Sequence, residues 1–311
     1  MQYVVQLAKE RNFSRAAEKL HIAQPSLSQQ LAKLESELGV LLFSRTTNSV
    51  EPTHAGSIFI EKAEAILDAV EQLRQEMDDI AQMRKGRLIV GSLPITGSHV
   101  LPHVLPVFRA RYPEIEVTLV EDTTSRLEQL TAVGQTDLSL LSLPLEDPSL
   151  AWEPLIEEEI LLAVPPKHRL AERTGGPGVE VPELAGEPFI VLKKGQGFRQ
   201  IAFDLCRNAG FEPRVVFESG NIETVQSLVA AGMGLAFVPQ MVARPAGTPL
   251  APVYLRLASA PTRTLVIASR TGRYRSKAAR AFIETLRETA PAAIAVPAGR
   301  GGGRPAPGGN G

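Results

Sequence analysis

Short polar side chains gather at one point of an otherwise ordinary helical segment near the N-terminus. The segment FSRAAEKLHIAQPSLSQQLAKLE covers residues 13–35, and its second half places two serines and three glutamines directly after a short break. These side chains are small, uncharged and able to donate and accept hydrogen bonds. In the first turns of a helix they suit contact with base edges in the major groove of DNA. DNA reading is therefore the first hypothesis.

The apolar residues of the same segment indicate which way this helix faces. Four leucines recur at intervals of four, three and four residues, which places them on one face of a helix. We expect this face to be buried and the polar face opposite to it to be exposed. Pro25 suits the first turn, where its missing N–H would have no helical partner. The four leucines are Leu27, Leu31, Leu34 and Leu38.

A shorter helix is expected just before this one. Ser14 is expected to cap a helix over residues 15–20, because a serine side chain can accept a hydrogen bond from a free N–H of the first turn. Residues 21–23 would then form the turn of a helix-turn-helix, whose second helix enters the major groove. A plain helical hairpin with a solvated outer face would show the same spacing, so that alternative stays open at this point.

The residues after the second helix add a wing to this motif. Residues 42–45 and 49–51 are predicted to form two short strands around a polar turn. With this addition, the segment FSRAAEKLHIAQPSLSQQLAKLESELGVLLFSR resembles the DNA-binding domain of LysR-type transcriptional regulators. A member of that family binds double-stranded promoter DNA, and it is also expected to contact RNA polymerase.

The resemblance assigns roles to individual positions of the motif. Residues 1–56 carry six basic and five acidic side chains, so charge alone gives this part little non-specific affinity for DNA. A larger share of the DNA affinity is therefore expected to come from dimerisation. Base contacts are implied for Gln24, Pro25, Ser28 and Gln29. Contacts with phosphates, which fix the register on DNA without reading its sequence, are implied for Ser14, Ser26, Lys33, Arg45 and Thr46.

A long heptad pattern follows the motif. Apolar residues repeat at alternating intervals of four and three between Thr53 and Arg84, a stretch without proline. A helix of about 30 residues would extend roughly 45 Å, and its narrow apolar stripe favours pairing with a second helix over packing on its own domain. The resemblance agrees, since the linker helix of LysR-type regulators pairs two subunits, and such dimers commonly join into tetramers. The seam consists of Phe59, Ala63, Ile66, Val70, Leu73, Met77 and Ile80.

Composition bounds the remaining possibilities. The chain has 311 residues, of which 44% are hydrophobic, so it can form two or three domains with substantial cores. Its net charge is −1, and it has a single cysteine, which fits a reducing compartment. No apolar run is long enough to span a membrane, and the N-terminus lacks the apolar core of a signal peptide. We expect a soluble, cytoplasmic protein that does not bind membranes.

From Gly86 the pattern changes to short apolar strands that alternate with helical segments. This alternation predicts an α/β fold with a mostly parallel sheet covered by helices. The chain is expected to cross between two lobes near Pro165 and again near Leu265. LysR-type effector domains have this two-lobed architecture, which is like that of periplasmic binding proteins. The expected division is a winged helix-turn-helix at 1–56, a linker and dimerisation helix at 57–85, an effector domain at 86–290 with lobe 1 at 86–163 and 266–290 and lobe 2 at 164–265, and a disordered tail at 291–311.

Hydroxyl groups and glycines gather where the predicted strands end. Ligands of open α/β sheets bind beyond the carboxyl ends of the strands, where helix N-termini offer free N–H groups. Such groups favour a small anionic effector, for example a carboxylate, bound between the lobes. Each hydroxyl taken alone is better explained as a helix cap, so the site rests on their convergence. The predicted effector-binding residues are Ser92, Thr96, Gly97, Ser98, Thr123, Thr124, Ser142, Gly197, Phe198, Asn221, Ile222 and Thr224.

Two segments, GSLPITGSHVLPHVLPVF and GQGFRQIAFDLC, resemble the peroxide-sensing branch of the same family. In that branch a reactive cysteine forms a disulfide with a second cysteine nine residues later. Cys206 matches the second position, but the first corresponds to Gly197, which has no thiol. A disulfide switch therefore cannot operate here, and we expect Cys206 to be an inert residue of a helix core.

Enzymatic sites find little support. His99 and His103 are four residues apart, but Pro102 interrupts the local helix and no HExxH motif is present, so we expect neither a metal ion nor a cofactor. No phosphate-binding loop and no GxSxG motif occurs. The consecutive acids of residues 157–159 would point in different directions from the backbone and are interpreted as solvated.

These observations favour a LysR-type regulator and leave two other classes open. One is a solute-binding or enzymatic α/β protein whose N-terminal helices serve assembly alone. The other is an architectural DNA-binding protein without an effector, which would bind DNA in the same way whether or not a metabolite is present.

Overall fold

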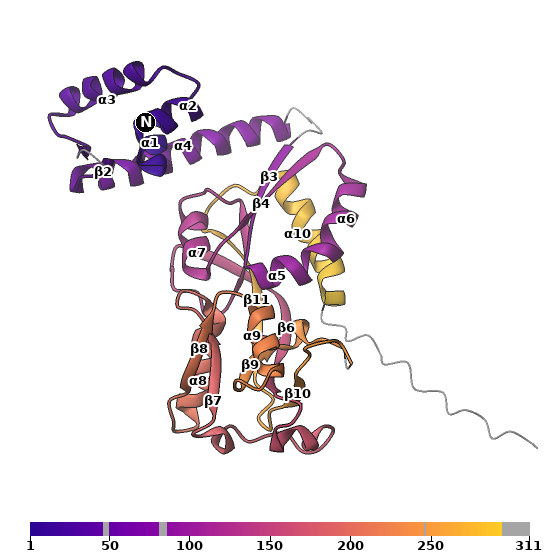
Figure 1. The fold of residues 1–311 in the computed structure, drawn as a ribbon. Coiled ribbons are helices and arrows are strands. Elements are labelled where there is room, and N and C mark those ends of the chain that lie inside the picture. The colour runs from indigo at the N-terminus through magenta and orange to yellow at the C-terminus, as the bar shows by residue number, and fades with distance from the viewer. Residues whose placement is uncertain (46–49, 81–85, 246, 294–311) are drawn as a thin grey trace, which may run out of the picture.

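The chain forms a small N-terminal domain, one long helix and a two-lobed α/β body (Figure 1). This is a computed structural model, and it describes residues 1–45, 50–80, 86–245 and 247–293. The predicted tail of residues 291–311 lies almost wholly outside these described residues.

The N-terminal domain is a winged helix-turn-helix. The two strands of the wing pair in antiparallel fashion, with Phe43 opposite Pro52. Its small core is formed by residues such as Leu7, Leu27 and Leu31, which are almost completely buried. The elements are α1 (Gln2–Glu10), α2 (Phe13–Lys19), α3 (Gln24–Leu38), β1 (Phe43–Arg45) and β2 (Val50–Pro52).

Two local predictions for this domain are wrong. The cap of α2 is Asn12, whose side-chain oxygen accepts a hydrogen bond from the Arg15 N–H, and Ser14 is a residue of the helix itself. Leu38 is 44% exposed because it ends α3, beyond the region that α1 and α2 cover, so the buried stripe stops before it. Glu35 takes the buried position near the end of the helix instead.

The long helix α4 (His54–Ile80) has 27 residues. Phe59 packs against the core of the N-terminal domain and Ala63 is buried, so the first turns of α4 belong to that domain. The rest of the predicted seam is exposed along the helix, except that the side chain of Ile80 lies outside the described part of the structure. The exposed seam residues are Ile66, Val70, Leu73 and Met77.

Lobe 1 is built on a mixed sheet. Strand β3 is parallel to β4 and β5, as expected, but β11 runs antiparallel between β5 and β6, so the sheet is not mostly parallel. The strands are β3 (Gly86–Ser92), β4 (Ile115–Glu121), β5 (Leu138–Ser142), β11 (Thr262–Arg270) and the first part of β6 (Leu150–Val164). The helices are α5 (Pro94–His99), α6 (Leu101–Arg111), α7 (Thr124–Ala132) and α10 (Lys277–Thr289), followed by the short η4 (Ala290–Ala293).

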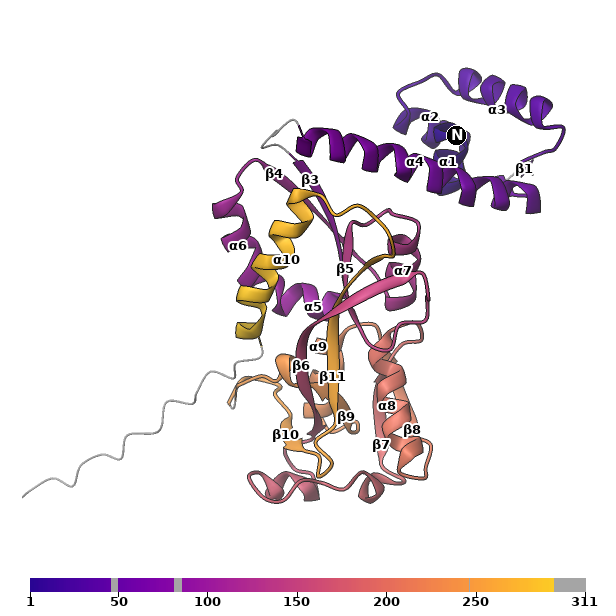
Figure 2. The same ribbon diagram turned by 180° about the vertical axis from the view of Figure 1, so that it is seen from behind.

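Lobe 2 is joined to lobe 1 by two continuous strands, β6 and β11 (Figure 2). The second part of β6 pairs with β9 and β10, while β7 and β8 form a separate parallel pair. The chain therefore crosses between the lobes within β6, before it reaches Pro165, and again within β11, which contains Leu265. Lobe 2 contains β7 (Pro188–Leu192), β8 (Arg214–Ser219), β9 (Ala236–Pro239), β10 (Val253–Arg256), α8 (Gly197–Asn208), α9 (Ile222–Ala230), η1 (Arg169–Arg173), η2 (Val181–Leu184) and η3 (Gln240–Val242).

One large apolar core extends through both lobes, and a smaller cluster that includes Leu127 and Leu141 lies in lobe 1. Phe108 and Phe282 meet edge to face in lobe 1, and Phe189 and Phe237 pack together in lobe 2. Among the described residues, no helix has the length and apolar character needed to cross a membrane.

Candidate functional site

The outer face of α3 presents the side chains expected to read DNA. Leu27 and Leu31 are buried, which turns the polar face of the helix outward. No acidic residue occupies the first turn, so the positive end of the helix dipole favours an approaching phosphate. Gln24, Pro25, Ser26, Gln29 and Lys33 are exposed and Ser28 is half-buried.

A buried carboxylate fixes the wing against this helix. Glu35 accepts hydrogen bonds from the Leu42 and Phe43 N–H groups at 2.7 and 3.1 Å. It therefore connects the end of α3 to the start of β1. Of the predicted phosphate contacts, Ser14 is exposed on α2, whereas Thr46 and the side chain of Arg45 lie outside the described part of the structure.

Three of the hydroxyls predicted at strand ends are fully buried in lobe 1. The Ser92 hydroxyl donates to the carbonyl oxygen of Leu93. Thr96, in the first turn of α5, and Ser142, at the end of β5, have hydroxyls without a hydrogen-bond partner among the described residues. A buried polar atom without a partner costs about 1–3 kcal/mol, so these two atoms mark a place where a further polar group would be stabilising.

The two lobes touch where α7 and α8 begin. The Gly197 N–H donates to the Thr124 hydroxyl at 3.0 Å, and the Ser125 hydroxyl donates to the Gly195 carbonyl at 3.4 Å. A Cβ atom at Gly197 would lie 3.0 Å from the Thr124 hydroxyl, so the absence of a side chain permits this close approach. The structure thus brings together Thr124 and Gly197, two of the residues named in the sequence analysis.

A cavity of about 360 Å³ lies beside this contact. It is bounded by the end of β5 at Leu143 and Pro144, by the first turns of α7, and by α8. The charged residues of its wall are Lys194, Arg199, Arg207, Glu128 and Glu146. Glu128 is buried and accepts hydrogen bonds from the Glu146 and Asp147 N–H groups, and Arg199 and Arg207 form ion pairs with Glu218 and Glu212. Lys194 is exposed and has no ion pair within the described residues, which leaves it available to an anion.

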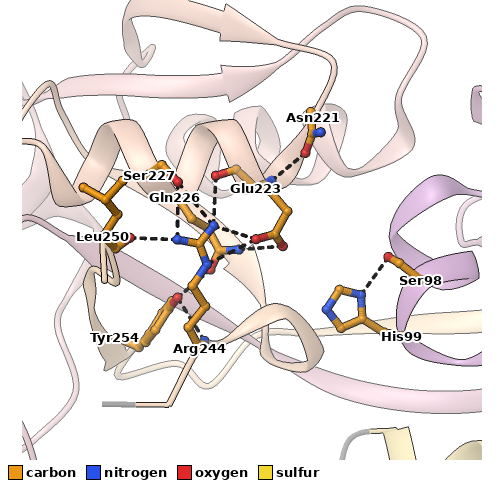
Figure 3. A network of polar contacts seen from close by, with 9 residues as sticks. All are labelled: Ser98, His99, Asn221, Glu223, Gln226, Ser227, Arg244, Leu250 and Tyr254. Atoms are coloured by element: carbon orange, nitrogen blue, oxygen red, sulfur yellow. Dashed lines mark hydrogen bonds and ion pairs between the residues drawn. The ribbon is translucent and has the colours of Figure 1, made fainter. Parts of the chain in front are cut away.

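The predicted effector-binding residues at the start of α9 do not line this cavity. The Asn221 side chain caps its own helix by accepting from the Glu223 N–H at 2.8 Å, Ile222 is buried, and Thr224 is exposed. Figure 3 shows that the polar network beside Asn221 is centred on Arg244, which binds Glu223, Ser227 and the Leu250 carbonyl.

Ser98, across from that network in Figure 3, is likewise engaged locally. Its hydroxyl donates to the Pro94 carbonyl of its own helix at 2.8 Å. Thr123 is half-buried at the N-cap position of α7, but its side chain makes no capping hydrogen bond. Gly97 lies close to both Ser92 and Glu121. A Cβ atom at this position would be 2.6 Å from a Glu121 carboxylate oxygen and 3.5 Å from the Ser92 hydroxyl.

A buried ion pair between Glu158 and Arg263 was missed by the sequence analysis. The Arg263 Nε–H donates to Glu158 Oε1 at 2.7 Å, and the guanidinium lies over the ring of Phe198. The interpretation of residues 157–159 as solvated is therefore wrong for Glu158. These residues lie on a strand, so alternate side chains point to opposite faces and Glu158 points inward. Burial lowers the pKa of Arg263, and the attraction of Glu158 opposes that effect.

Cys206 is buried in α8, as expected of an inert thiol. Burial, assisted by the negative charge of Glu212, raises its pKa to about 12. The thiol is therefore protonated at neutral pH and is a poor nucleophile. Within the described residues, no group of three or more His, Cys, Asp or Glu side chains is arranged to hold a metal ion.

Comparison with known proteins identifies both parts of the chain. Residues 1–57 match the family described as "Bacterial regulatory helix-turn-helix protein, lysR family", and residues 81–291 match the "LysR substrate binding domain". The chain is 44% identical over 304 residues to the uncharacterized HTH-type transcriptional regulator YcgK of Bacillus subtilis, with 93% of each chain covered. It is 34% identical over 273 residues to the DNA-binding transcriptional dual regulator OxyR of Escherichia coli, with 88% of each covered.

Solved structures agree with these matches. A full-length OxyR variant from Pseudomonas aeruginosa has a TM-score of 0.72 at 28% identity, with 93% of both chains covered. The relatives are transcriptional regulators and not enzymes, which removes the enzymatic alternative. The chain belongs to the LysR family of transcriptional regulators, with an N-terminal DNA-binding helix-turn-helix and a C-terminal effector-binding domain of two lobes.

Proposed function

We propose that the protein binds promoter DNA as a dimer or a pair of dimers, and that a small anionic effector bound between the lobes changes its occupancy or geometry on DNA. A ligand shifts such an equilibrium only if it binds one geometry more tightly than the other. Contact with RNA polymerase is part of the same proposal.

The DNA-binding part of the proposal is supported by the outer face of α3. Gln24 and Gln29 are exposed, and neither side chain forms a hydrogen bond with another described residue, so both are available to base edges. Ser28 lies between them in sequence and is half-buried. A glutamine that binds adenine through two hydrogen bonds contributes about 1–3 kcal/mol of discrimination.

Dimerisation is supported by the exposed apolar seam of α4. Ile66, Val70, Leu73 and Met77 are each close to half exposed or more, and they follow one another at heptad spacing. Apolar side chains in such a row are stabilised when a second helix covers them. A two-fold dimer would present two copies of α3 to two half-sites.

The effector part of the proposal is carried by one observation, the unpartnered hydroxyls of Thr96 and Ser142. Thr96 lies in α5, which begins two residues after β3 ends, and Ser142 is the last residue of β5. Leu143, next to Ser142, lines the cavity beside the contact between the lobes. Lys194 on the wall of that cavity favours a negative charge on the ligand. Small carboxylates are therefore the first effectors to try.

Thermal unfolding of the full chain tests this effector site. A carboxylate ligand at a concentration of a hundred times its dissociation constant stabilises the folded state by about 2.7 kcal/mol. It should raise the midpoint temperature of unfolding by a few degrees. We expect Thr96→Val and Ser142→Ala to abolish this increase. Thr224→Val is the matched control, because Thr224 is exposed on α9 and should leave the increase intact. An increase that survives in both Thr96→Val and Ser142→Ala would place the ligand elsewhere.

A regulator without an effector is the second candidate. It would show no stabilisation by carboxylates, other anions or peroxide, and its DNA affinity would be the same in their presence. A ligand-dependent change in DNA affinity that Thr96→Val removes would exclude this candidate.

A further inference from the structure

The linker helix α4 is joined to lobe 1 of its own chain by a buried acidic side chain. The Asp68 carboxylate forms ion pairs with Arg270 at 2.9 Å and with Arg273 at 3.1 Å. It also accepts a hydrogen bond from the Gln72 side chain at 2.6 Å. The Asp68 side chain is only 4% exposed, although it lies near the middle of a helix that is otherwise largely solvated. Removing a carboxylate from water costs free energy unless charged partners compensate it. A helix that only connected two domains would have no reason to bury one.

The lobe 1 side of this contact is itself rigidly held. Arg273 also pairs with Asp137 at 3.0 Å and donates to the Thr136 carbonyl at 3.1 Å. Asp137 in turn accepts the Ile89 N–H of β3 at 2.7 Å. The positive charges of the two arginines balance the negative charges of the two aspartates. The network connects α4 directly to the central strands of lobe 1.

The backbone of lobe 1 is shaped to receive Asp68. Gly134 follows α7 with φ +78°, and a Cβ atom there would lie 2.2 Å from Asp68 Cγ. Any side chain at this position would therefore collide with the carboxylate. Two further hydrogen bonds extend the interface along α4, from the Gln135 side chain to Glu64 at 2.7 Å and from the Tyr274 N–H to Gln72 at 3.4 Å.

These contacts use a different face of α4 from the apolar seam. Glu64, Asp68 and Gln72 are spaced four residues apart, so they form one row along the helix. At about 100° per residue, this row lies roughly opposite the row that contains Val70 and Leu73. The helix can therefore bind lobe 1 of its own chain and a second subunit at the same time.

We propose that Asp68, Arg270, Arg273 and Gly134 form an interdomain joint that sets the angle between the linker helix and lobe 1. Because α1 packs on α4, the joint also fixes the orientation of the winged helix relative to the effector domain (Figure 2). Asp68 is thus a positioning residue for DNA binding. Changes in lobe 1 reach the DNA-binding domain through this contact. The inference rests on the proposed binding of two half-sites for its effect on DNA, but the joint can be tested without DNA.

Pulsed electron paramagnetic resonance on the full chain measures the joint directly. Spin labels are attached to Glu37→Cys on α3 and Arg280→Cys on α10, both exposed, and the labelled protein is mixed with excess unlabelled chain. Cys206 is buried and stays unlabelled. We expect Asp68→Asn, which keeps the shape and removes the charge, to broaden or shift the distance distribution. Glu76→Gln, an exposed residue of the same helix, should leave it as in the wild type. An unchanged distribution in Asp68→Asn would overturn the joint.

A double-mutant cycle tests the contact between Asp68 and Gly134. Gly134→Ala should displace α4, whereas Gly210→Ala, at φ +86° with nothing within 4 Å, carries the same backbone strain without a collision. In an Asp68→Ala background the collision is removed, so Gly134→Ala should add no further displacement. A displacement of equal size in both backgrounds would contradict the proposal.

DNA binding provides a separate test. Half a helical turn is about 5 bp, so inserting it between two half-sites turns one of them to the wrong side of the duplex. We expect this insertion to weaken binding of the wild type about tenfold or more and to weaken Asp68→Asn clearly less. Equal losses would mean that the joint does not set the geometry on DNA. Absence of all specific DNA binding would refute the proposed function and leave the distance measurements unaffected.

Discussion

The carboxylate of Glu35, near the end of α3, accepts a hydrogen bond of 2.7 Å from the backbone N–H of Leu42, where the chain enters the wing. Because a second N–H, that of Phe43, binds the same oxygen, removing the carboxylate leaves two backbone donors without this acceptor. We predict that Glu35→Ala lowers the free energy of unfolding by about 1.5–3 kcal/mol, measured by denaturant titration of the full chain. Glu37→Ala, exposed on the same helix, should have little effect. Equal losses for the two variants would contradict the structural role of Glu35.

The buried pair of Glu158 and Arg263 gives a second prediction. Arg263→Met leaves the Glu158 carboxylate buried without its cation, which should cost about 3–5 kcal/mol in unfolding free energy. The carboxylate still accepts the Met241 N–H, which compensates it in part. The double variant Glu158→Leu with Arg263→Met should recover much of the loss, because both charges are then gone.

The neighbouring pair of Glu159 and Arg256 is a matched control. Arg256 Nη2 and Glu159 Oε2 are 2.8 Å apart, with Glu159 next to Glu158 on β6 and Arg256 on β10, but the arginine side chain is 72% exposed. Arg256→Met should leave the unfolding free energy nearly unchanged, since solvent screens such pairs. If Arg256→Met were as damaging as Arg263→Met, burial would not be the cause of the effect.

Cys206 should be unreactive in the folded protein. Its pKa of about 12 keeps the thiol protonated at pH 8, so alkylation by iodoacetamide should be slow until denaturant exposes the thiol. A folded pKa above the unfolded value of about 9.0 also means that this group's stabilisation is present below pH 9 and is lost as pH rises toward 12. Peroxide should produce no intramolecular disulfide. Rapid alkylation of the native chain would contradict the buried position.

The apolar seam of α4 predicts how the subunit pairing responds to substitution. Leu73→Lys places a charge on the seam, and covering a leucine contributes roughly 1.5–3 kcal/mol, so the dissociation constant of the dimer should rise more than about tenfold. Glu71→Lys, an exposed change on the same helix at a position that points away from the seam, should leave it nearly unaltered. Sedimentation equilibrium measures both. A Leu73→Lys protein with wild-type association would remove α4 from the interface.

The sequence predicts repeated local patterns well and distant partners poorly. Heptad spacing identified α4 and its exposed seam, and strand alternation placed β3, β4 and β5 correctly. It did not predict that β11 would insert antiparallel between β5 and β6, because that pairing joins segments more than a hundred residues apart. The same reason explains why Arg263 was missed, since its partner Glu158 lies 105 positions earlier.

Position within an element also limited the prediction. Leu38 continues the leucine spacing of α3, but it lies past the helices that cover the face, so periodicity alone overstates its burial. Among the residues predicted to bind an effector, Thr124 and Gly197 form a hydrogen bond, whereas Asn221 and Ser98 form hydrogen bonds within their own helices. Capping and ligand binding use the same side chains, and sequence cannot separate them.

Binding of the full chain to genomic DNA fragments selected by the wild-type protein tests the central claim most directly. Footprinting on a selected site should show two protected half-sites, and Gln24→Ala or Ser28→Ala should each weaken specific binding by about fivefold or more while the protein remains folded. Gln30→Ala, exposed on the same helix, is the control and should bind as the wild type does. Unchanged protection by folded Gln24→Ala and Ser28→Ala proteins would contradict the claim that the outer face of α3 reads the promoter.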